Sequence, residues 1–208
     1  MNQNLPNEII IATGNAGKVR EFKEILTGFI VSSMGERGIH AEVEETGTTF
    51  RENAYLKAKA LADELARRGI CAIAVADDSG IEIDAFDKGP GVYSARFLGH
   101  DTPYEIKNKI ILDRLRDTPA EERTTRYVAS VVAVLPDGQV LDGYGTVEGL
   151  IAWKPEGEGG FGYDPIFYVP EFGKSMACLT PDEKNSISHR GRALREFVRK
   201  LREEDNTD

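Results

Sequence analysis

Cysteine is scarce in this chain, because only Cys71 and Cys178 occur among its 208 residues. Two cysteines are too few for a disulfide framework, and these two do not have the spacing of metal ligands. The scarcity favours a reduced compartment. We therefore expect a cytoplasmic protein.

Long apolar runs and an excess of positive charge are also missing. The longest apolar runs, at 70–76 and 128–135, have the length of strands, so we expect neither a signal peptide nor a membrane span. The chain carries 26 Lys and Arg against 35 Asp and Glu, a formal net charge of −9. This balance disfavours nucleic-acid polymers and anionic membranes as partners. A small anionic substrate remains possible, because a few local cations and a divalent metal act at contact distance.

What is present is an alternation of strand and helix patterns over a length that can bury a large core. Strands are predicted at 8–12, 29–33 and 70–76, and helices after Lys18, after Thr49, at 103–115, after Thr180 and after Ser188. The turn at 136–138 joins two further strands into a hairpin. We predict a mixed α/β fold with a mostly parallel central sheet flanked by helices, an antiparallel hairpin extension and two lobes around a cleft. Residues 1–208 are expected to form this single two-lobed domain.

The first strand leads into a turn that contains glycine and ends in a lysine, Thr13-Gly14-Asn15-Ala16-Gly17-Lys18. Backbone N–H groups at the start of a helix, with a nearby lysine, are typical of phosphate sites. The turn is not a Walker A loop, because Ala12 and Val19 stand where that motif has Gly and Ser or Thr. An ordinary strand-to-helix turn with an exposed lysine is the alternative.

A pair of carboxylates follows the strand predicted at 70–76, in Asp77-Asp78-Ser79-Gly80. Ligands gather at the carboxyl ends of strands in open α/β sheets. Because successive side chains diverge, one carboxylate can ligate Mg²⁺ or orient water while the other braces the backbone or a neighbouring cation. Glu44 or Glu45 could supply a second metal ligand. The alternatives are a plain acidic turn and solvated loop acids.

Two segments near the C-terminus together indicate a pocket for a flat heteroaromatic ring. Phe161 and Tyr163 offer π-faces and Asp164 an acceptor, while His189 and Arg190 could donate to an exocyclic oxygen. The alternatives are core aromatics and a helix start with exposed cations. A hydrolytic pair of Cys178 and His189 is disfavoured, because no third group orients it.

In their order along the chain, these motifs resemble those of the inosine triphosphate pyrophosphatase family, over about residues 9–201. The matching blocks are Thr13–Lys18, Glu44–Gly47 with Phe50 and Glu52–Ala54, Asp77–Gly80, Gly91–Arg96, Gly160–Pro165 and Ser188–Gly191. The resemblance implies an elongated two-lobed α/β fold with the active site in the cleft, and a cytosolic homodimer. It also implies a Mg²⁺-dependent hydrolysis of ITP, dITP or XTP to the monophosphate and pyrophosphate.

The resemblance further implies a role for each matching residue. Lys18, Asp77 and Asp78 would be catalytic, with Asp78 as proton acceptor, and Glu44 and Asp78 would hold Mg²⁺. The substrate-binding residues would be Thr13, Gly14, Asn15, Ala16, Gly17, Lys18, Lys57, Ser79, Phe161, Gly162, Tyr163, Asp164, Lys184, His189 and Arg190. Two other hypotheses stay open: a Maf-like pyrophosphatase for other modified nucleotides, and a purine-nucleotide-binding module without turnover.

Overall fold

The computed structural model describes residues 6–41 and 43–204. They form two compact units, each assembled from separate stretches of the chain. Within the described residues, unit 1 consists of 6–78, 129–145 and 190–204, and unit 2 consists of 79–128 and 146–189. The hydrogen-bonded strand order is β2-β1-β3-β5-β6-β7-β8, with β4 beside β3. Strands β3 (Ile73–Ile83), β5 (Thr124–Val134) and β6 (Val140–Ile151) contribute residues to both units.

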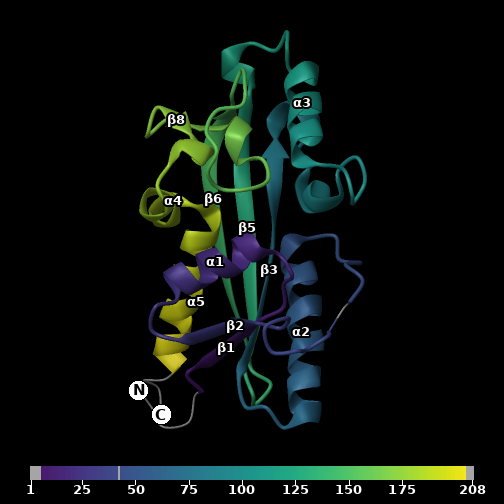
Figure 1. Ribbon diagram of the computed structural model, residues 1–208, viewed down its shortest axis with the longest axis vertical. Helices are drawn as coiled ribbons and strands as arrows, with labels where there is room; N and C mark the ends of the chain where they lie inside the picture. Colours follow the sequence, from purple (N-terminus) through teal and green to yellow (C-terminus); the bar gives the residue numbers. More distant parts are fainter. Residues whose placement is uncertain (1–5, 42, 205–208) are drawn as a thin grey trace. The chain divides into compact units, whose positions relative to one another are not determined.

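Unit 1 is built on parallel strands. Strand β1 (Glu8–Ile11) pairs in parallel with β2 (Ile30–Ser33) and with the first part of β3. Helices α1 (Ala16–Ile25) and α5 (His189–Glu204) pack on one face of these strands, and α2 (Phe50–Arg68) packs on the other (Figure 1). The sheet of unit 1 is therefore covered by helices on both faces.

The alternation of side chains along β3 explains these two layers. Ile73 and Val75 lie in a core with residues of α1 and α5, whereas Ala74 and Ala76 lie in a second core with residues of α2. The apolar run is buried on both sides, as expected for a central strand.

The ends of α2 follow the local sequence. The Thr49 side chain accepts from the Glu52 N–H and the Glu52 carboxylate accepts from the Thr49 N–H, which completes a capping box. The helix ends at Gly69, whose φ of 66° lies in the left-handed region. Both ends agree with the predicted helix.

Unit 2 is antiparallel where its pairings are described. Strand β4 (Gly89–Pro90) pairs with β3, while β7 (Phe167–Val169) lies between β6 and β8 (Lys174–Ser175). Its helices are α3 (Tyr104–Arg114) and α4 (Pro181–Ile187). The short 3₁₀ helices are Asp84–Phe86, Gly91–Arg96, Ala120–Glu122, Asp164–Ile166 and Met176–Cys178. A separate core that includes Ile81, Ile111 and Phe167 holds the unit together.

The predicted mixed α/β class, with a mostly parallel central sheet flanked by helices, is confirmed. The predicted hairpin is present as β5 and β6, closed by a hydrogen bond of 2.9 Å from the Leu135 N–H to the Gln139 carbonyl oxygen. The predicted end of the third strand is wrong. Strand β3 passes through Asp77 and Asp78 and continues to Ile83, because Ile81 and Ile83 resume the buried alternation.

None of the helices in the described ranges combines the length and the apolar character needed to span a bilayer. Cys71 and Cys178 are both free and exposed.

Candidate active site

The predicted phosphate turn lies between β1 and α1. The Asn15 side chain caps α1 by accepting from the N–H groups of Gly17, at 2.9 Å, and Lys18, at 3.2 Å. Gly14, Asn15 and Ala16 are exposed, and a Cβ atom added to Gly14 would meet nothing within 4 Å. The turn is therefore open to a ligand. Two of the first-turn N–H groups already serve the helix cap, which leaves Ala16 N–H and the side chains to bind an anion.

Asp77 is the centre of a buried ionic cluster in unit 1. Its Oδ2 accepts from Arg190 Nε at 3.0 Å and Nη2 at 2.9 Å, and its Oδ1 lies 3.1 Å from Lys18 Nζ. Arg190 also donates to the buried carboxylate of Glu21. Burial opposes ionisation of Asp77, but Arg190, Lys18 and Lys57 outweigh it and hold the pKa of Asp77 below its ordinary value. Asp77 therefore stays ionised.

Asp78 has a different set of partners. Lys57 Nζ donates to its Oδ1 at 3.1 Å, and Asn53 Nδ2 donates to its Oδ2 at 3.3 Å. Burial raises the pKa of Asp78, and the nearby Glu45 raises it further, against the opposing effect of Lys57. Asp78 is thus the more basic of the two adjacent carboxylates.

The divergence predicted for the two carboxylates is observed. Asp77 continues the alternation of Ile73 and Val75 toward α1 and α5, and Asp78 continues that of Ala74 and Ala76 toward α2. Two titratable groups whose environments push their pKa values apart suit different roles. Asp77 is suited to holding the side chains of Lys18 and Arg190 in place, and Asp78 is suited to accepting a proton.

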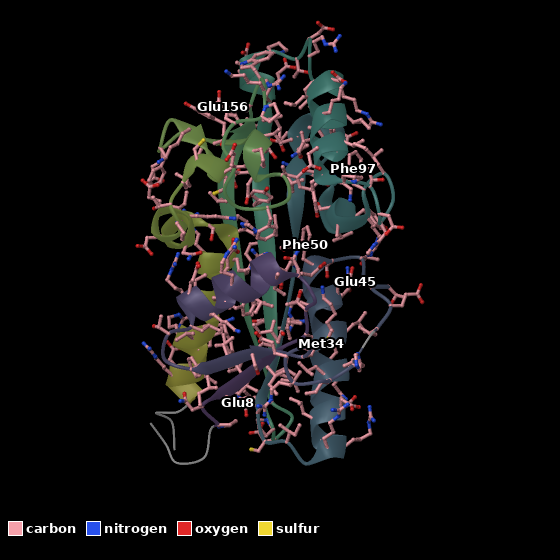
Figure 2. The ribbon with its side chains drawn as sticks, viewed as in Figure 1. Glu8, Met34, Glu45, Phe50, Phe97 and Glu156 are labelled. Carbon is pink, nitrogen blue, oxygen red and sulfur yellow. The ribbon has the colours of Figure 1, made fainter. Side chains whose placement is uncertain are left out.

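The carboxylates near Asp78 suit a cation. Lys57 Nζ lies 2.8 Å from Glu45 Oε1 as well as 3.1 Å from Asp78 Oδ1, so these two side chains already share one positive charge. Glu45, which is labelled in Figure 2, lies in the segment before α2. Glu44, the predicted metal ligand, is exposed, so Glu45 is the acid that the structure brings near Asp78.

The donor set fits a magnesium-type ion with few protein ligands. No group of three or more His, Cys, Asp or Glu that could hold a metal occurs in the described part of the chain. Mg²⁺ commonly takes only one or two protein carboxylates and fills its remaining positions with water and substrate phosphates. A pair such as Asp78 and Glu45 is sufficient for that mode of binding.

Asn53 lies in one of the matching blocks of the sequence, at 52–54, but the sequence interpretation gave it no role in this site. It is fully buried, and its Oδ1 accepts from the Gly47 N–H at 2.8 Å while its Nδ2 donates to Asp78. A Cβ atom on Gly47 would lie 2.7 Å from Asn53 Oδ1, so only glycine permits this approach. Asn53 thereby links the acidic loop to Asp78. Asn53 precedes Ala54 and lies one turn or so before Ala58, and both alanines are buried in the core between α2 and the sheet. This position in the sequence could have indicated that the Asn53 side chain is buried.

In unit 2, Asp164 is the centre of the predicted base-binding segment. Its Oδ2 accepts from Lys184 Nζ at 2.7 Å and from the Phe161 N–H at 2.8 Å, and its Oδ1 accepts from the Tyr127 hydroxyl at 3.2 Å. Gly160 has a φ of 70°, and a Cβ atom there would lie 2.1 Å from Asp164 Oδ2. Asp164 therefore acts as the brace that shapes the turn.

The two aromatic side chains of this segment have different environments. Phe161 is half-buried, with Lys184 Nζ 4.8 Å from its ring centroid. Tyr163 is buried in the core, where its hydroxyl donates to the Ser94 carbonyl oxygen at 2.7 Å. Tyr163 is thus more deeply buried than Phe161, and its role as a substrate contact stays a prediction.

The two predicted donors to the base belong to different units, because the unit boundary falls between His189 and Arg190. His189 is buried and stacks on Tyr127, with 4.7 Å between ring centroids. The Arg190 guanidinium is buried and forms ion pairs with Asp77 and Glu21. Its position in the sequence did not indicate these ion pairs. Ser79 lies within β3, directly after Asp78.

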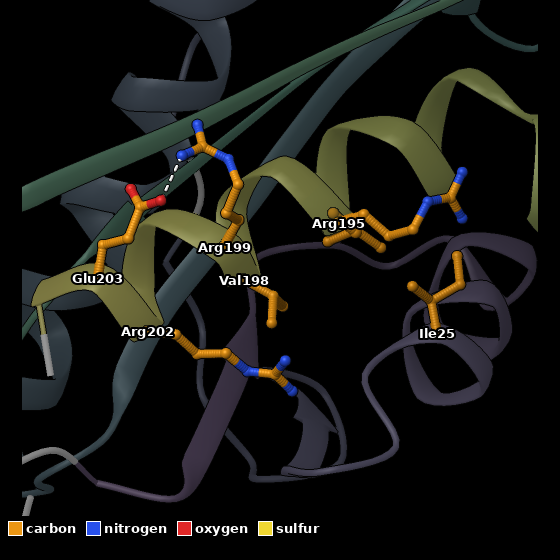
Figure 3. Close-up of a pocket in the computed structure, with 7 residues that line it drawn as sticks. Ile25, Arg195, Val198, Arg199, Arg202 and Glu203 are labelled. Carbon is orange, nitrogen blue, oxygen red and sulfur yellow. Dashed lines mark hydrogen bonds and ion pairs between the residues drawn. The ribbon is translucent and has the colours of Figure 1, made fainter. Parts of the chain in front are cut away.

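Hollows also occur in unit 1. One of about 660 Å³ is lined in part by Thr13, Gly14 and Ala16 of the phosphate turn. Another, of about 430 Å³, lies against α5 and the end of α1, with the side chains of Arg195, Arg199 and Arg202 around it (Figure 3). None of the predicted site residues lines this second hollow.

Comparison with known proteins decides the family. The model of the Ham1 family matches residues 9–200. The chain belongs to the Ham1 family. The predicted resemblance is thereby confirmed.

Relatives with similar lengths support this membership. The dITP/XTP pyrophosphatase of Exiguobacterium sibiricum is 46% identical over 192 residues, which cover 91% of this chain and 94% of that protein. The dITP/XTP pyrophosphatase of Bacillus subtilis is also 46% identical, with 93% and 96% covered.

Solved structures of Ham1 proteins share the fold. The Staphylococcus aureus Ham1 protein aligns with a TM-score of 0.80 and 40% identity, covering 95% of this chain and 99% of its own. A HAM1 protein from Coxiella burnetii aligns with a TM-score of 0.81 and 36% identity, with 94% and 98% covered. Ham1-family pyrophosphatases are generally metal-dependent, which agrees with the cation-sharing carboxylates of unit 1.

Proposed function

We propose that this Ham1 protein hydrolyses ITP, dITP and XTP to the nucleoside monophosphate and pyrophosphate, which removes deaminated purines from the nucleotide pool. The observation that carries the proposal is the pair Asp77 and Asp78, which have separate partners: Asp77 binds Arg190 and Lys18, and Asp78 binds Lys57 and Asn53. Relatives named dITP/XTP pyrophosphatase, matched over nearly their whole length, support the same substrate class.

The residues of unit 1 account for the phosphate end of the reaction. Lys18 lies beside the exposed turn of Thr13 to Gly17 and is oriented by Asp77, so its ammonium can stabilise charge that develops on the departing pyrophosphate. Asp78 accepts the proton of the attacking water. Lys57 joins the phosphate contacts when substrate draws it from its carboxylates.

Mg²⁺ is the metal that we propose. Asp78 and Glu45 would hold it, and it would supply neutralisation of the triphosphate charge. Both side chains already approach one ammonium group, which supports a cation-binding role for the pair.

The residues of unit 2 account for the base end. Phe161 offers a half-buried ring for stacking, and Lys184 and His189 are donors held by Asp164 and Tyr127. Deamination replaces the 6-amino group of adenine, a donor, by a 6-oxo acceptor. Donors placed at that edge would pair with hypoxanthine or xanthine and remain unsatisfied against adenine, at a cost of about 1–3 kcal/mol each.

A homodimer in the cytoplasm completes the proposal. Light scattering should give twice the monomer mass of 22.9 kDa. A panel of modified nucleotides distinguishes this function from that of a Maf-like pyrophosphatase, and pyrophosphate release distinguishes it from a binding module.

The deciding experiment is pyrophosphate release from ITP, XTP, ATP and GTP with Mg²⁺ present, for the wild type and for Asp78→Asn. This nearly isosteric change should preserve the melting temperature and lower kcat by at least about 100-fold. It removes the proton acceptor and the negative charge of one carboxylate that would bind the metal. Near-normal ITP hydrolysis by the variant would exclude Asp78 as the proton acceptor. Release of inorganic phosphate in place of pyrophosphate would exclude the reaction itself.

A matched pair of variants tests the metal ligand. Glu45→Gln should raise the Mg²⁺ concentration for half-maximal activity at least several-fold, whereas Glu44→Gln should leave it unchanged, since only Glu45 shares a cation with Asp78. The reverse order of effects would restore Glu44 as the ligand.

A further inference from the structure

Tyr127 of β5 is a buried tyrosine that contacts the base site of unit 2 in two ways. Its ring stacks on His189, with centroids 4.7 Å apart and planes at 16°. The Tyr127 ring also stacks on the Phe167 ring, with centroids 4.4 Å apart and planes at 17°. Its hydroxyl donates to Asp164 Oδ1 at 3.2 Å. One side chain therefore touches both a predicted donor to the base and the carboxylate that shapes the aromatic turn.

Tyr127 binds a different oxygen of Asp164 from Lys184 and Phe161. Lys184 Nζ and the Phe161 N–H donate to Asp164 Oδ2, whereas the Tyr127 hydroxyl donates to Oδ1. Burial and the charge of Asp164 raise the pKa of Tyr127 well above its ordinary value. The phenol therefore stays protonated and donates throughout the neutral range.

We infer that Tyr127 is a positioning residue of the base site: its hydroxyl fixes the rotation of the Asp164 carboxylate, and its ring fixes the plane of His189. This inference rests on the proposed function, because it assigns the base to the segment around Phe161 and Asp164. Tyr127 acts through these two residues and does not itself touch the reacting phosphorus.

The two contacts can be separated by substitution. Tyr127→Phe removes the hydroxyl and keeps the ring, whereas Tyr127→Leu removes both. Since one hydrogen bond contributes on the order of a fivefold change in an equilibrium constant, Tyr127→Phe should raise KM for ITP about fivefold. Its kcat should stay within about twofold, because an interaction remote from the phosphorus that is lost equally from ground and transition states changes KM alone.

A double-mutant cycle tests whether the hydroxyl acts through Asp164. If it does, Tyr127→Phe raises KM in the wild-type background but adds little in the Asp164→Asn background. Full additivity of the two effects would overturn the inference. An unchanged KM in Asp164→Asn alone would overturn the proposed base site, and the inference with it. A raised KM in Asp164→Asn but not in Tyr127→Phe would overturn only the inference.

The stacking contact has a readout independent of activity. The face of Tyr127 should shift the His189 ring protons upfield in the NMR spectrum, and the chain contains only two other histidines, His40 and His100. Tyr127→Phe should keep this shift and Tyr127→Leu should lose it. An unchanged His189 signal in a folded Tyr127→Leu variant would show that the ring does not orient the imidazole.

Tyr168→Phe is the matched control. Tyr168 lies in β7 of the same unit, and its hydroxyl has no hydrogen-bond partner within the described part of the chain. Its loss should leave KM, kcat and the His189 signal unchanged. A KM increase equal to that of Tyr127→Phe would mean that any lost phenol in unit 2 has the same effect, and would overturn the inference.

Discussion

Arg190 illustrates how a residue's environment can change its expected role. Its position at the start of a helix downstream of the aromatic segment suggested a reader of the base edge, and that role stays a prediction. Its guanidinium is buried against two carboxylates, Asp77 and Glu21. Removing one member of a buried ionic cluster leaves the others uncompensated.

We therefore expect Arg190→Ala to lower the free energy of unfolding by about 3–5 kcal/mol, because Asp77 and Glu21 would remain buried without their cation. Urea denaturation measures the effect, with the exposed Arg199→Ala as control. If Arg190 acts only within the cluster with Asp77 and Glu21, the kcat/KM values for ITP and ATP should fall by similar factors. A stable variant with altered selectivity would instead support base reading by Arg190.

Asp77 also gives stability a pH dependence whose sign can be stated. Burial alone would raise the pKa of Asp77, but Arg190 and Lys18 hold it below the ordinary value of about 4. A carboxyl group with a lowered pKa in the folded state contributes stability that is present above that ordinary value and is lost as the pH falls through and below it. The pKa of Asp78 is raised, so its ionisation lowers the stability of the folded state as the pH rises through the ordinary value.

Urea denaturation of Asp77→Asn at pH 7, 5 and 3.5 isolates this contribution. The variant should be less stable than the wild type at pH 7, and the difference should shrink toward pH 3.5. Asp63→Asn, which removes a carboxylate from an exposed pair on α2, is the matched surface control. If the free energies of unfolding of Asp77→Asn and the wild type differed by the same amount at all three pH values, the lowered pKa of Asp77 would be contradicted.

At the scale of elements, local signals determined what could be predicted. Thr49 with Glu52 and Gly69 mark both ends of α2, and the turn at 136–138 marks the β5–β6 hairpin, because these residues act on their immediate neighbours. The end of β3 was misplaced, because Asp77 and Asp78 are turn-forming residues whose strand conformation depends on partners far away in sequence. Lys18, Lys57 and Arg190 supply those partners.

The contact between β6 and α5 leads to a prediction at this scale. A Cβ atom on Gly143 would lie 2.0 Å from the Ala193 carbonyl oxygen and 2.9 Å from the Phe197 nitrogen, and backbone atoms cannot rotate away. Gly143→Ala should therefore lower the free energy of unfolding by about 1–3 kcal/mol, or more if α5 must move. Thermal unfolding should show no comparable loss for Gly28→Ala, where a Cβ meets nothing within 4 Å. Equal melting temperatures for the two variants would exclude close packing at Gly143.

At the scale of the whole molecule, the sequence was most informative about which residue types the site contains and least informative about how they pair. Asp78, Lys18 and Asp164 could be selected from their motifs. The pairings of Asn53 with Asp78 and of Tyr127 with Asp164 join residues distant in the chain, and no local pattern encodes them. The burial of Tyr163 could not be predicted for the same reason, because its hydrogen bond to Ser94 is a tertiary contact.

The division into units has a consequence for dissecting the protein. The chain passes from one unit to the other at 78–79, 128–129, 145–146 and 189–190, and each passage lies inside β3, β5, β6 or α5. Neither unit corresponds to one uninterrupted stretch of the gene. A single truncation, or an exchange of halves with a related protein at one crossover point, would therefore divide a strand or a helix and deprive both units of part of their cores. To exchange one complete unit with a related protein, a recombinant would need crossovers at all four of these positions.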